Sequence, residues 1–212
     1  FVLRERTPIK NGWGLYLFRM DTPQNIVIEA PHPITDEYTE NVALDLYRAL
    51  HAKALLISGT TRNANADGSA DSAHATKSIF QTIHITLFNH AGHPNDATIF
   101  LQIHGYATQQ SHQSYPQVVI SFNWKNDPEK DLLITKITQA LQNNDITAGV
   151  CNGKNYRDIC GTENVQRLVT NGGIFIHLEL NESLRKRDNS LINALQQALR
   201  PSSMPNLYPS NQ

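Results

Sequence analysis

Two histidines follow apolar segments that are typical of buried strands. His32 comes directly after the run NIVIEAP, and His104 follows ATIFLQI and precedes Gly105. Functional sites of open α/β sheets lie beyond the carboxyl ends of the strands, which is where both histidines would stand. Since neutral imidazole is a good zinc ligand, we expect His32 and His104 to bind one metal ion. The alternative is that each is a hydrogen-bonded loop histidine.

A carboxylate close to His32 would complete a set of three protein ligands. Asp36 lies four residues after His32, and Glu37 is a second choice. A turn between a strand and the next helix would let His32 and Asp36 face one cleft, so we expect Asp36 to be the third ligand. The same position also suits a helix N-cap, whose side chain accepts the orphan amide protons of the first turn.

Glu179 stands inside the otherwise apolar segment GGIFIHLEL. A buried carboxylate costs on the order of several kcal/mol unless it is paired, hydrogen-bonded or functional. Strand alternation places His177 on the same face as Glu179, so the two could also simply form a polar face. If the site holds zinc, we expect Glu179 to be the general base that takes a proton from water.

The segment after LLISGT adds polar side chains at a third strand end. We expect Arg62 to stabilise an oxyanion or bind a substrate carboxylate, and Asn63 to contact substrate. Arg62 could instead be a surface loop arginine. Asp71 and His74 form D-x-x-H at a helix start, a spacing that places them on one face. They are either an alternative ligand pair, or Asp71 caps the helix while His74 reaches the cleft to bind substrate or transfer a proton.

The other histidines occupy positions with less chemical promise. His84 falls inside a predicted helix, His51 lies near a helix end, and His90, His93 and His112 lie in loops. We expect these side chains to be solvated at the surface.

Strand-like and helix-like segments alternate along the chain. Apolar β-branched runs predict strands, and apolar residues at helical spacing, such as Val42 and Leu46, predict helices. The predicted strands are 12–20, 25–30, 52–59, 97–105, 117–122 and 172–180, and the predicted helices are one capped at Thr35 or Asp36, then 78–88, 131–142 and 190–199. Because helices usually supply the crossovers between parallel strands, residues 1–200 are expected to form one α/β domain, a mostly parallel mixed sheet with helices on both faces. Residues 201–212 are expected to be a surface strap or a disordered tail.

Composition argues against several partner classes. Charged residues make up 17% of the chain, below the roughly 25% usual for soluble proteins, and 20 Asn and 13 Gln supply polarity instead. With a net charge of -1 and no dense run of Lys or Arg, the chain lacks the basic footprint of a nucleic-acid or anionic-membrane binder. No apolar stretch approaches the roughly 20 residues of a spanning helix. We expect neither partner, and the oligomeric state stays open.

Cys151 and Cys160 lie nine positions apart in the segment CNGKNYRDIC, a spacing that permits a disulfide. A thiolate metal pair is the alternative, but zinc sites with two cysteines usually have shorter spacings and need further ligands. A disulfide would indicate an oxidising compartment, either a periplasm or the exterior. The first residue, Phe1 in place of Met, agrees with a processed leader or a trimmed chain.

Several short segments together resemble the zinc carboxypeptidase-like amidohydrolases, a group that includes N-formylglutamate amidohydrolases and phage poly-γ-glutamate hydrolases. The segments are H-P-x-x-D, G-T-T-R-N, D-S-A-H, H-G and F-I-H-L-E, and the resemblance runs from about Gly12 to Arg185. It implies a parallel-rich sheet and one catalytic zinc. Carboxypeptidases carry H-x-x-E, whereas Thr35 stands three residues after His32, so the carboxylate must be Asp36 or Glu37.

Carried over by position, the resemblance implies a role for each candidate residue. His32, Asp36 and His104 would hold zinc, Glu179 would be the base, and Arg62 would polarise a carbonyl or bind a carboxylate. The expected function is zinc-dependent hydrolysis of amide bonds in a small peptide, acyl-amino acid or poly-glutamyl substrate. The alternative is an inactive binding module for peptides or cell-wall fragments on the same fold. A serine or cysteine hydrolase is disfavoured because the chain has no G-x-S-x-G elbow and its cysteines look structural.

Overall fold

A computed structural model describes the chain except residues 22, 91–97, 108–113, 152–153, 187–188 and 201–212. Its strands are β1 (Val2–Arg4), β2 (Leu15–Phe18), β3 (Gln24–Ala30), β4 (Ala52–Ile57), β5 (Ile99–Gly105), β6 (Val118–Phe122), β7 (Ala148–Val150) and β8 (Ile174–Leu180). Its helices are α1 (Thr39–Ala49), α2 (Ile79–Asn89), α3 (Pro128–Gln142), α4 (Val165–Val169), α5 (Glu182–Arg185) and α6 (Asn189–Ala198). The α/β class expected from the sequence is confirmed, and the predicted tail lies outside the described residues.

The strands form one mixed sheet in the order β1-β2-β4-β3-β5-β8-β6-β7. Strands β4, β3, β5 and β8 run parallel to one another, and β6 and β7 are a second parallel pair. The antiparallel pairings join β1 to β2, β2 to β4 and β6 to β8. The carboxyl ends of the four central strands therefore meet at one edge, as the α/β prediction requires.

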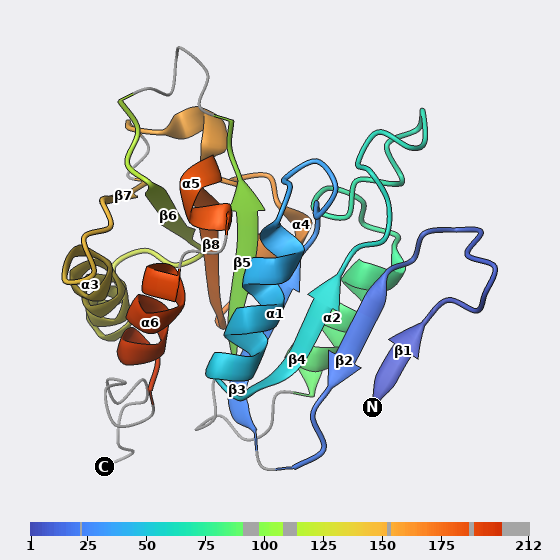
Figure 1. The fold of residues 1–212 in the computed structure, drawn as a ribbon, viewed down its shortest axis with the longest axis horizontal. Coiled ribbons are helices and arrows are strands. Elements are labelled where there is room, and N and C mark those ends of the chain that lie inside the picture. The colour runs from blue at the N-terminus through green and yellow to red at the C-terminus, as the bar shows by residue number, and fades with distance from the viewer. Residues whose placement is uncertain (22, 91–97, 108–113, 152–153, 187–188, 201–212) are drawn as a thin grey trace.

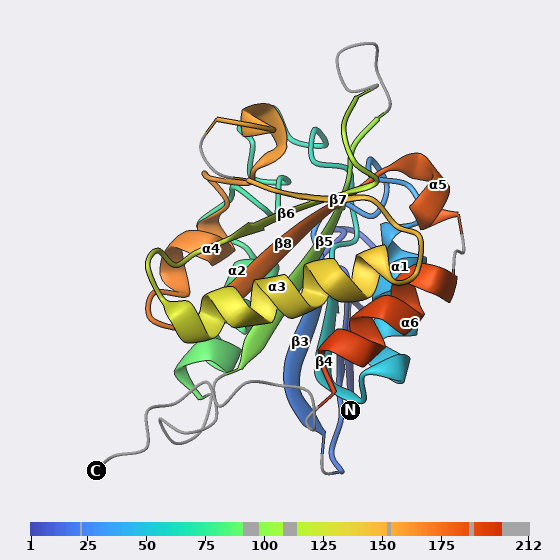
Figure 2. The same cartoon turned by 90° about the vertical axis from the view of Figure 1, so that its left-hand side faces the viewer.

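Helices cover both faces of the sheet (Figures 1 and 2). Helices α1, α3 and α6 enclose the larger core, to which the sheet contributes Ile28, Leu101 and Ile176. Helix α2 encloses a smaller core on the opposite face, around Phe100 and Phe175. Burial on both faces explains why the central strands are nearly continuous apolar runs in the sequence.

The face that α2 covers changes character toward the carboxyl ends of β3, β5 and β8. Register places three layers in order: Val27, Phe100 and Phe175, then Glu29, Gln102 and His177, and finally His104 and Glu179. Side chains two positions apart in a strand point to the same face of the sheet. The residues in each strand are spaced by two, so they all point to one side. Apolar packing therefore gives way to buried polar groups, and these to potential metal ligands.

Helix α1 begins later than the sequence suggested. We expected its cap at Thr35 or Asp36, but α1 starts at Thr39 with Tyr38 as N-cap and with no side-chain cap hydrogen bond. Among the strands and α-helices of the described residues, four were not predicted: β1, β7, α4 and α5, which have 3, 3, 5 and 4 residues. Such short segments contain too few residues to show a helical or strand period.

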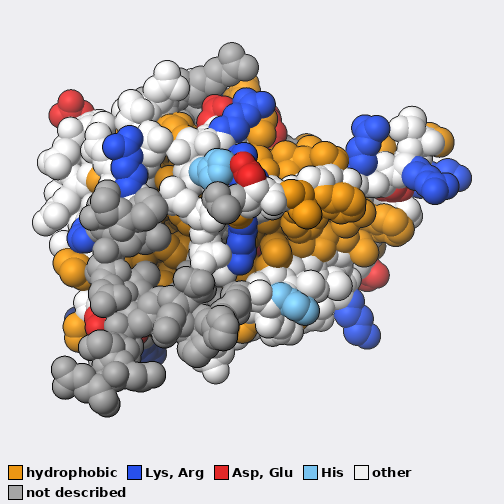
Figure 3. Space-filling view, turned by 90° about the horizontal axis from the view of Figure 1, so that it is seen from below, with side chains coloured by type: hydrophobic (Ala, Val, Ile, Leu, Met, Phe, Trp, Pro, Cys, Tyr) orange, Lys and Arg blue, Asp and Glu red, His pale blue; other side chains and the backbone are white. Residues whose placement is uncertain are grey.

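Apolar side chains gather on the side opposite the carboxyl ends of the central strands (Figure 3). Figure 3 shows hydrophobic side chains gathered there, on the side of the molecule that carries β1 and β2. Phe1, Val2 and Leu3 of this edge are exposed. In the part of the chain that the structure describes, no helix combines the length and apolarity needed to cross a membrane.

Candidate metal centre

Three residues predicted as metal ligands come together at the carboxyl ends of β3 and β5. Oδ2 of Asp36 lies 3.2 Å from Nδ1 of His104 and 3.7 Å from Nδ1 of His32. The three side chains are buried, and each offers a ligand atom within 4.8 Å of the other two. Two imidazoles and a carboxylate at this spacing are a donor set suited to Zn²⁺.

The turn after β3 brings Asp36, and not Glu37, into the cluster. The amide N of Asp36 donates to the carbonyl of His32 at 2.8 Å, and the amide N of Gly105 donates to Oδ2 of Asp36 at 3.2 Å. Glu37 is exposed. The interpretation of Asp36 as a helix cap is wrong, because α1 begins three residues after Asp36. The side chain of Asp36 instead faces β5.

Nδ1 of His32 is buried and has no hydrogen-bond partner among the described residues. The other ring nitrogen, Nε2, lies 2.7 Å from Oδ1 of Asp71. A carboxylate accepts hydrogen bonds, so in the neutral ring Nε2 carries the proton and Nδ1 presents a lone pair toward Asp36 and His104. A buried lone pair without a partner is costly, and a bound cation would satisfy it. This observation shows that the residues present fit a metal ion.

Asp71 is anchored from several sides. Its Oδ2 accepts from Nε and Nη2 of Arg62 at 3.1 and 2.8 Å, and its Oδ1 accepts from the amide of Ala73 at 3.2 Å. Burial opposes ionisation, but hydrogen bonds to His32 and His74 and the charge of Arg62 hold the pKa of Asp71 well below its usual range. Asp71 therefore orients His32, which fits this contact pattern better than direct ligation.

Of the predicted substrate residues, Arg62 and His74 reach the cluster. Nδ1 of His74 lies 3.0 Å from Oδ2 of Asp71 and 3.5 Å from Nη2 of Arg62. Its ring stacks on that of His32 at 6.5 Å. Both side chains are partly exposed, as substrate contact requires. Asn63 is exposed, and no contact in the described part of the chain joins it to the cluster.

Glu179 lies beside His104 in the register of β5 and β8. Burial raises the pKa of its carboxyl group well above the usual range, and the charge of Asp36 adds to this effect, against Arg185 and Arg62. Its Oε1 is 3.5 Å from Nε2 of His177. A carboxyl group that is raised in pKa and adjoins the ligand set is suited to proton transfer near neutral pH.

His177 lies between His104, a candidate metal ligand, and Gly161, which follows the disulfide. Burial, aided by the charge of His104, lowers its pKa well below the usual range, so the ring is neutral. Cys151 and Cys160 form the expected disulfide. Gly161, the next residue, approaches the ring of His177 so closely that an added Cβ would lie 2.8 Å from Nε2. The residue that follows the disulfide thus packs against the ring of His177.

The sequence interpretation missed a buried polar layer beneath the cluster. Nδ1 of His84, on α2, lies 2.7 Å from Oε1 of Glu29, and Nε2 of Gln102 donates to Oε2 of Glu29 at 2.9 Å. The prediction that His84 is a solvated surface residue is wrong, because His84 is fully buried. Glu29 and Gln102 interrupt apolar strands just as Glu179 does, and that signal could have revealed them.

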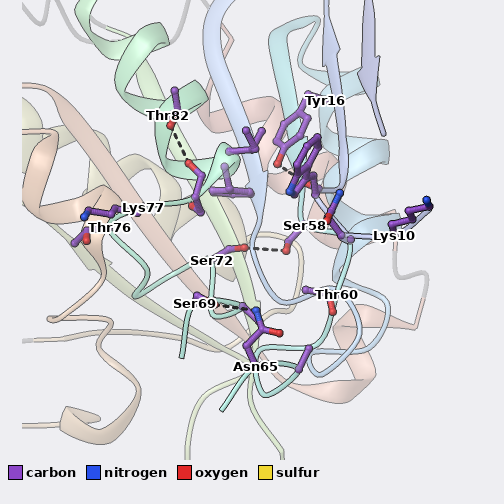
Figure 4. A pocket seen from close by; sticks show the side chains of 18 residues that line it. Lys10, Tyr16, Ser58, Thr60, Asn65, Ser69, Ser72, Thr76, Lys77 and Thr82 are labelled. Atoms are coloured by element: carbon purple, nitrogen blue, oxygen red, sulfur yellow. Dashed lines mark hydrogen bonds between the residues drawn. The ribbon is translucent and has the colours of Figure 1, made fainter. Parts of the chain in front are cut away.

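A cavity of about 730 Å³ lies beside the segment that carries Asp71. Ser72 and Ser58 line it, and their hydroxyl oxygens are 2.8 Å apart (Figure 4). Lys10 and Lys77 extend outward at its two sides in the same view. His32, Asp36 and His104 do not line this cavity, so the cavity is a neighbour of the candidate centre and not part of it.

Solved structures share this architecture. A bacteriophage poly-gamma-glutamate hydrolase matches with a TM-score of 0.53 and 16% identity, over 86% of this chain and 83% of that one. YNDL in its zinc-free apo form matches with 0.55 and 13%, over 88% and 89%. N-formylglutamate amidohydrolase from Ralstonia eutropha JMP134 matches with 0.51 and 12%, over 87% and 93%. No protein-family model and no curated protein sequence matches the chain. At these identities the likeness shows a shared fold.

Proposed function

We propose that this protein is a zinc-dependent hydrolase of amide bonds. The observation that carries the proposal is the buried Nδ1 of His32, which faces Asp36 and His104 and has no hydrogen-bond partner among the described residues. The hydrolases named among the structures of the same fold support an amide-bond hydrolase in general. His32, Asp36 and His104 would hold the metal, leaving a coordination position open, as catalytic zinc sites do.

When bound, Zn²⁺ supplies a Lewis acid that polarises the scissile carbonyl and makes water a stronger nucleophile. The residues around the metal would transfer protons and stabilise charge. Glu179 accepts a proton at its carboxylate during attack by water and returns it to the leaving nitrogen. Its raised pKa makes the carboxylate a stronger base than an exposed glutamate, which favours this exchange near neutral pH.

Arg62 and His74 are the proposed contacts to substrate. Arg62 has a planar fork of donors and lies at the cluster through Asp71, so it can bind an oxyanion or a substrate carboxylate. His74 is partly exposed next to it and can bind substrate or carry a proton. Asn63 is exposed on the same loop, and we propose that it contacts the bound substrate.

The proposed substrate is a small peptide, an acyl-amino acid or a poly-glutamyl compound. Two of the structures with the same fold are named for glutamyl compounds, namely poly-gamma-glutamate and N-formylglutamate. The Cys151–Cys160 disulfide is compatible with an oxidising location, so we propose a periplasmic or secreted protein.

Metal analysis and hydrolysis assays test the proposal together. Purified protein, dialysed and reloaded, should bind one equivalent of zinc and hydrolyse members of a panel of N-formylglutamate, γ-glutamyl and α-linked peptides. His104→Ala should lose both properties, whereas His90→Ala, at an exposed helix end, should keep them. Zinc binding that is unchanged in His104→Ala would refute the ligand set, and metal binding without turnover of any amide would favour the binding module.

A further inference from the structure

The proton on the His104 ring decides which nitrogen can bind a cation. Nδ1 of His104 faces Asp36, and Nε2 lies 2.8 Å from Oε1 of Gln102. A side-chain amide can present either its oxygen or its NH₂ group to a neighbour. The contact with Gln102 alone therefore leaves the tautomer of His104 open. The groups around Gln102 decide it.

One constraint begins at a backbone carbonyl. Nε2 of Gln166 lies 2.9 Å from the carbonyl oxygen of Ser72, which can only accept a hydrogen bond. Gln166 must therefore turn its Oε1 the other way, where it lies 3.3 Å from Nε2 of Gln102. Oε2 of Glu29 is a second acceptor, 2.9 Å from the same nitrogen. Gln102 thus donates both its protons on this side and presents its oxygen to His104.

A second constraint begins at the first turn of α4. Oδ1 of Asn164 caps this helix by accepting from the amides of Gln166 and Arg167 at 3.0 and 3.2 Å. The amide group of Asn164 therefore points its Nδ2 away from the helix, and it donates to Oε1 of Gln102. Two separate sets of backbone groups thus impose the same orientation on Gln102.

The three amides cannot reorient cheaply. Gln102 and Gln166 are 0% exposed and Asn164 is 2% exposed, so no solvent replaces a lost partner. Reversing Gln102 would bring its oxygen against two acceptors, and each buried group left unsatisfied costs about 1 to 3 kcal/mol. Asp36 is also buried and accepts from the amide of Gly105 at 3.2 Å, but its charged carboxylate, unlike a neutral amide, can take up a cation. Both Oε1 of Gln102 and Oδ2 of Asp36 accept hydrogen bonds, but a neutral His104 ring carries only one proton. The proton therefore goes to Gln102, and Asp36 is left to bind a cation.

We propose that Gln102, held by Gln166 and Asn164, is a positioning residue that keeps the proton of His104 on Nε2. Nδ1 is thereby reserved for a cation shared with Asp36. The inference deepens the proposed function and rests on its ligand set. Asp71 achieves the same result for His32 with a carboxylate, which cannot donate. At His104, the chain uses neutral amides whose direction the backbone imposes.

The test is the imidazole ¹⁵N spectrum of metal-free, histidine-labelled protein at a pH where His104 is neutral. We expect the wild-type proton at Nε2. In Gln102→Met, we expect it at Nδ1, because Asp36 can then accept it while Nε2 accepts from Asn164. Zinc affinity, measured by competition with a chelator, should fall about 10- to 100-fold, as for other groups that orient a metal ligand.

Gln81→Met is the matched control. Gln81 is also buried and accepts from Nε2 of Gln166 at 2.6 Å, but Ser72 still orients Gln166 without it. This variant should keep the Nε2 proton. If Gln102→Met does not fold, Asn164→Asp retains the α4 cap and removes the donor to Gln102, and it should move part of the population to the Nδ1 tautomer.

An Nδ1 proton in the wild-type protein, or an Nε2 proton in both Gln102→Met and Asn164→Asp, would overturn the inference. Both readings use metal-free protein. Zinc binding and turnover in a wild-type protein with an Nδ1 proton would sink this inference and leave the proposed function intact. If the tautomers are as expected but the protein binds no zinc, the proposed function fails and the orientation of His104 by Gln102 stands.

Discussion

Nε2 of His32 lies 2.7 Å from Oδ1 of Asp71, although 39 residues separate the two in the chain. The contact joins the turn after β3 to the long loop before α2, and it leaves Nδ1 of His32 free to face Asp36 and His104. Because Arg62 binds the other oxygen of Asp71, one carboxylate holds both His32, the proposed metal ligand, and Arg62, the proposed substrate contact. Each part of this arrangement can be perturbed separately.

Asp71→Asn should weaken zinc binding about 10- to 100-fold, because an uncharged amide no longer holds the His32 ring by a charge-assisted bond. The measurement is a competition titration with a chromophoric chelator. Asp67→Asn is the control, since Asp67 lies in the same loop, is exposed and contacts only Ser69 among the described hydrogen-bond partners. Equal affinities of the two variants would show that Asp71 does not orient the ligand.

Asp36→Asn should abolish stoichiometric zinc retention after dialysis, whereas Glu37→Gln should retain zinc. The reason is geometric, because Asp36 is buried against both histidines and Glu37 is exposed. Metal content by atomic emission distinguishes the variants. Loss of zinc from Glu37→Gln alone would reverse the assignment of the carboxylate ligand.

Glu179→Gln should reduce kcat by about 10²- to 10⁴-fold, the usual contribution of a general base, while zinc stays bound. Steady-state kinetics and metal analysis of the same preparation are required. The control is Glu182→Gln, which removes an exposed carboxylate at the start of α5 that pairs with Lys186. This variant should leave kcat unchanged. Retained turnover in Glu179→Gln would remove Glu179 from the mechanism.

Glu179 should also make the metal-free protein less stable as pH rises. Its folded-state pKa is raised by burial above the ordinary value of 4.5, so the native state binds more protons than the unfolded state between these two values. The free energy of unfolding therefore falls as pH increases through this window, by about 1.4 kcal/mol for each pKa unit. Urea denaturation from about pH 5 to about pH 8 should show this slope in the wild type and a smaller one in Glu179→Gln. If the free energy of unfolding falls equally with pH in both proteins, Glu179 does not carry a raised pKa in the folded state.

Gly161→Ala should destabilise the protein more than Gly68→Ala does. Both glycines have positive φ, +55° and +76°, so both variants carry the cost of a left-handed backbone at alanine, about 1 to 2 kcal/mol. Only the Cβ at position 161 meets an obstacle, the ring of His177, whereas nothing lies within 4 Å of a Cβ at position 68. The difference in free energy of unfolding, about 1 to 3 kcal/mol for overpacking, measures this contact. Equal destabilisation of the two variants would show that Gly161 is not packed on His177.

Much of the fold was predictable because the information is local. Apolar runs placed the central strands, and helical spacing placed α1, α2, α3 and α6, since burial on both faces imprints a period on the sequence. Short elements such as β7 and α5 have no such imprint. The strand-end positions of His32 and His104 followed from the same reasoning, and the structure brings these two residues together.

The amino-acid order was therefore enough to indicate the α/β class, the disulfide and a histidine pair at one sheet edge. It could not separate Asp36 from Glu37, assign Asp71 to His32, or show that His84 and Gln102 lie beneath the cluster. Those contacts join segments as many as 73 residues apart, as Gln102 and Glu29 do. They depend on the register between strands and on the path of loops, and the packing of the whole chain determines both.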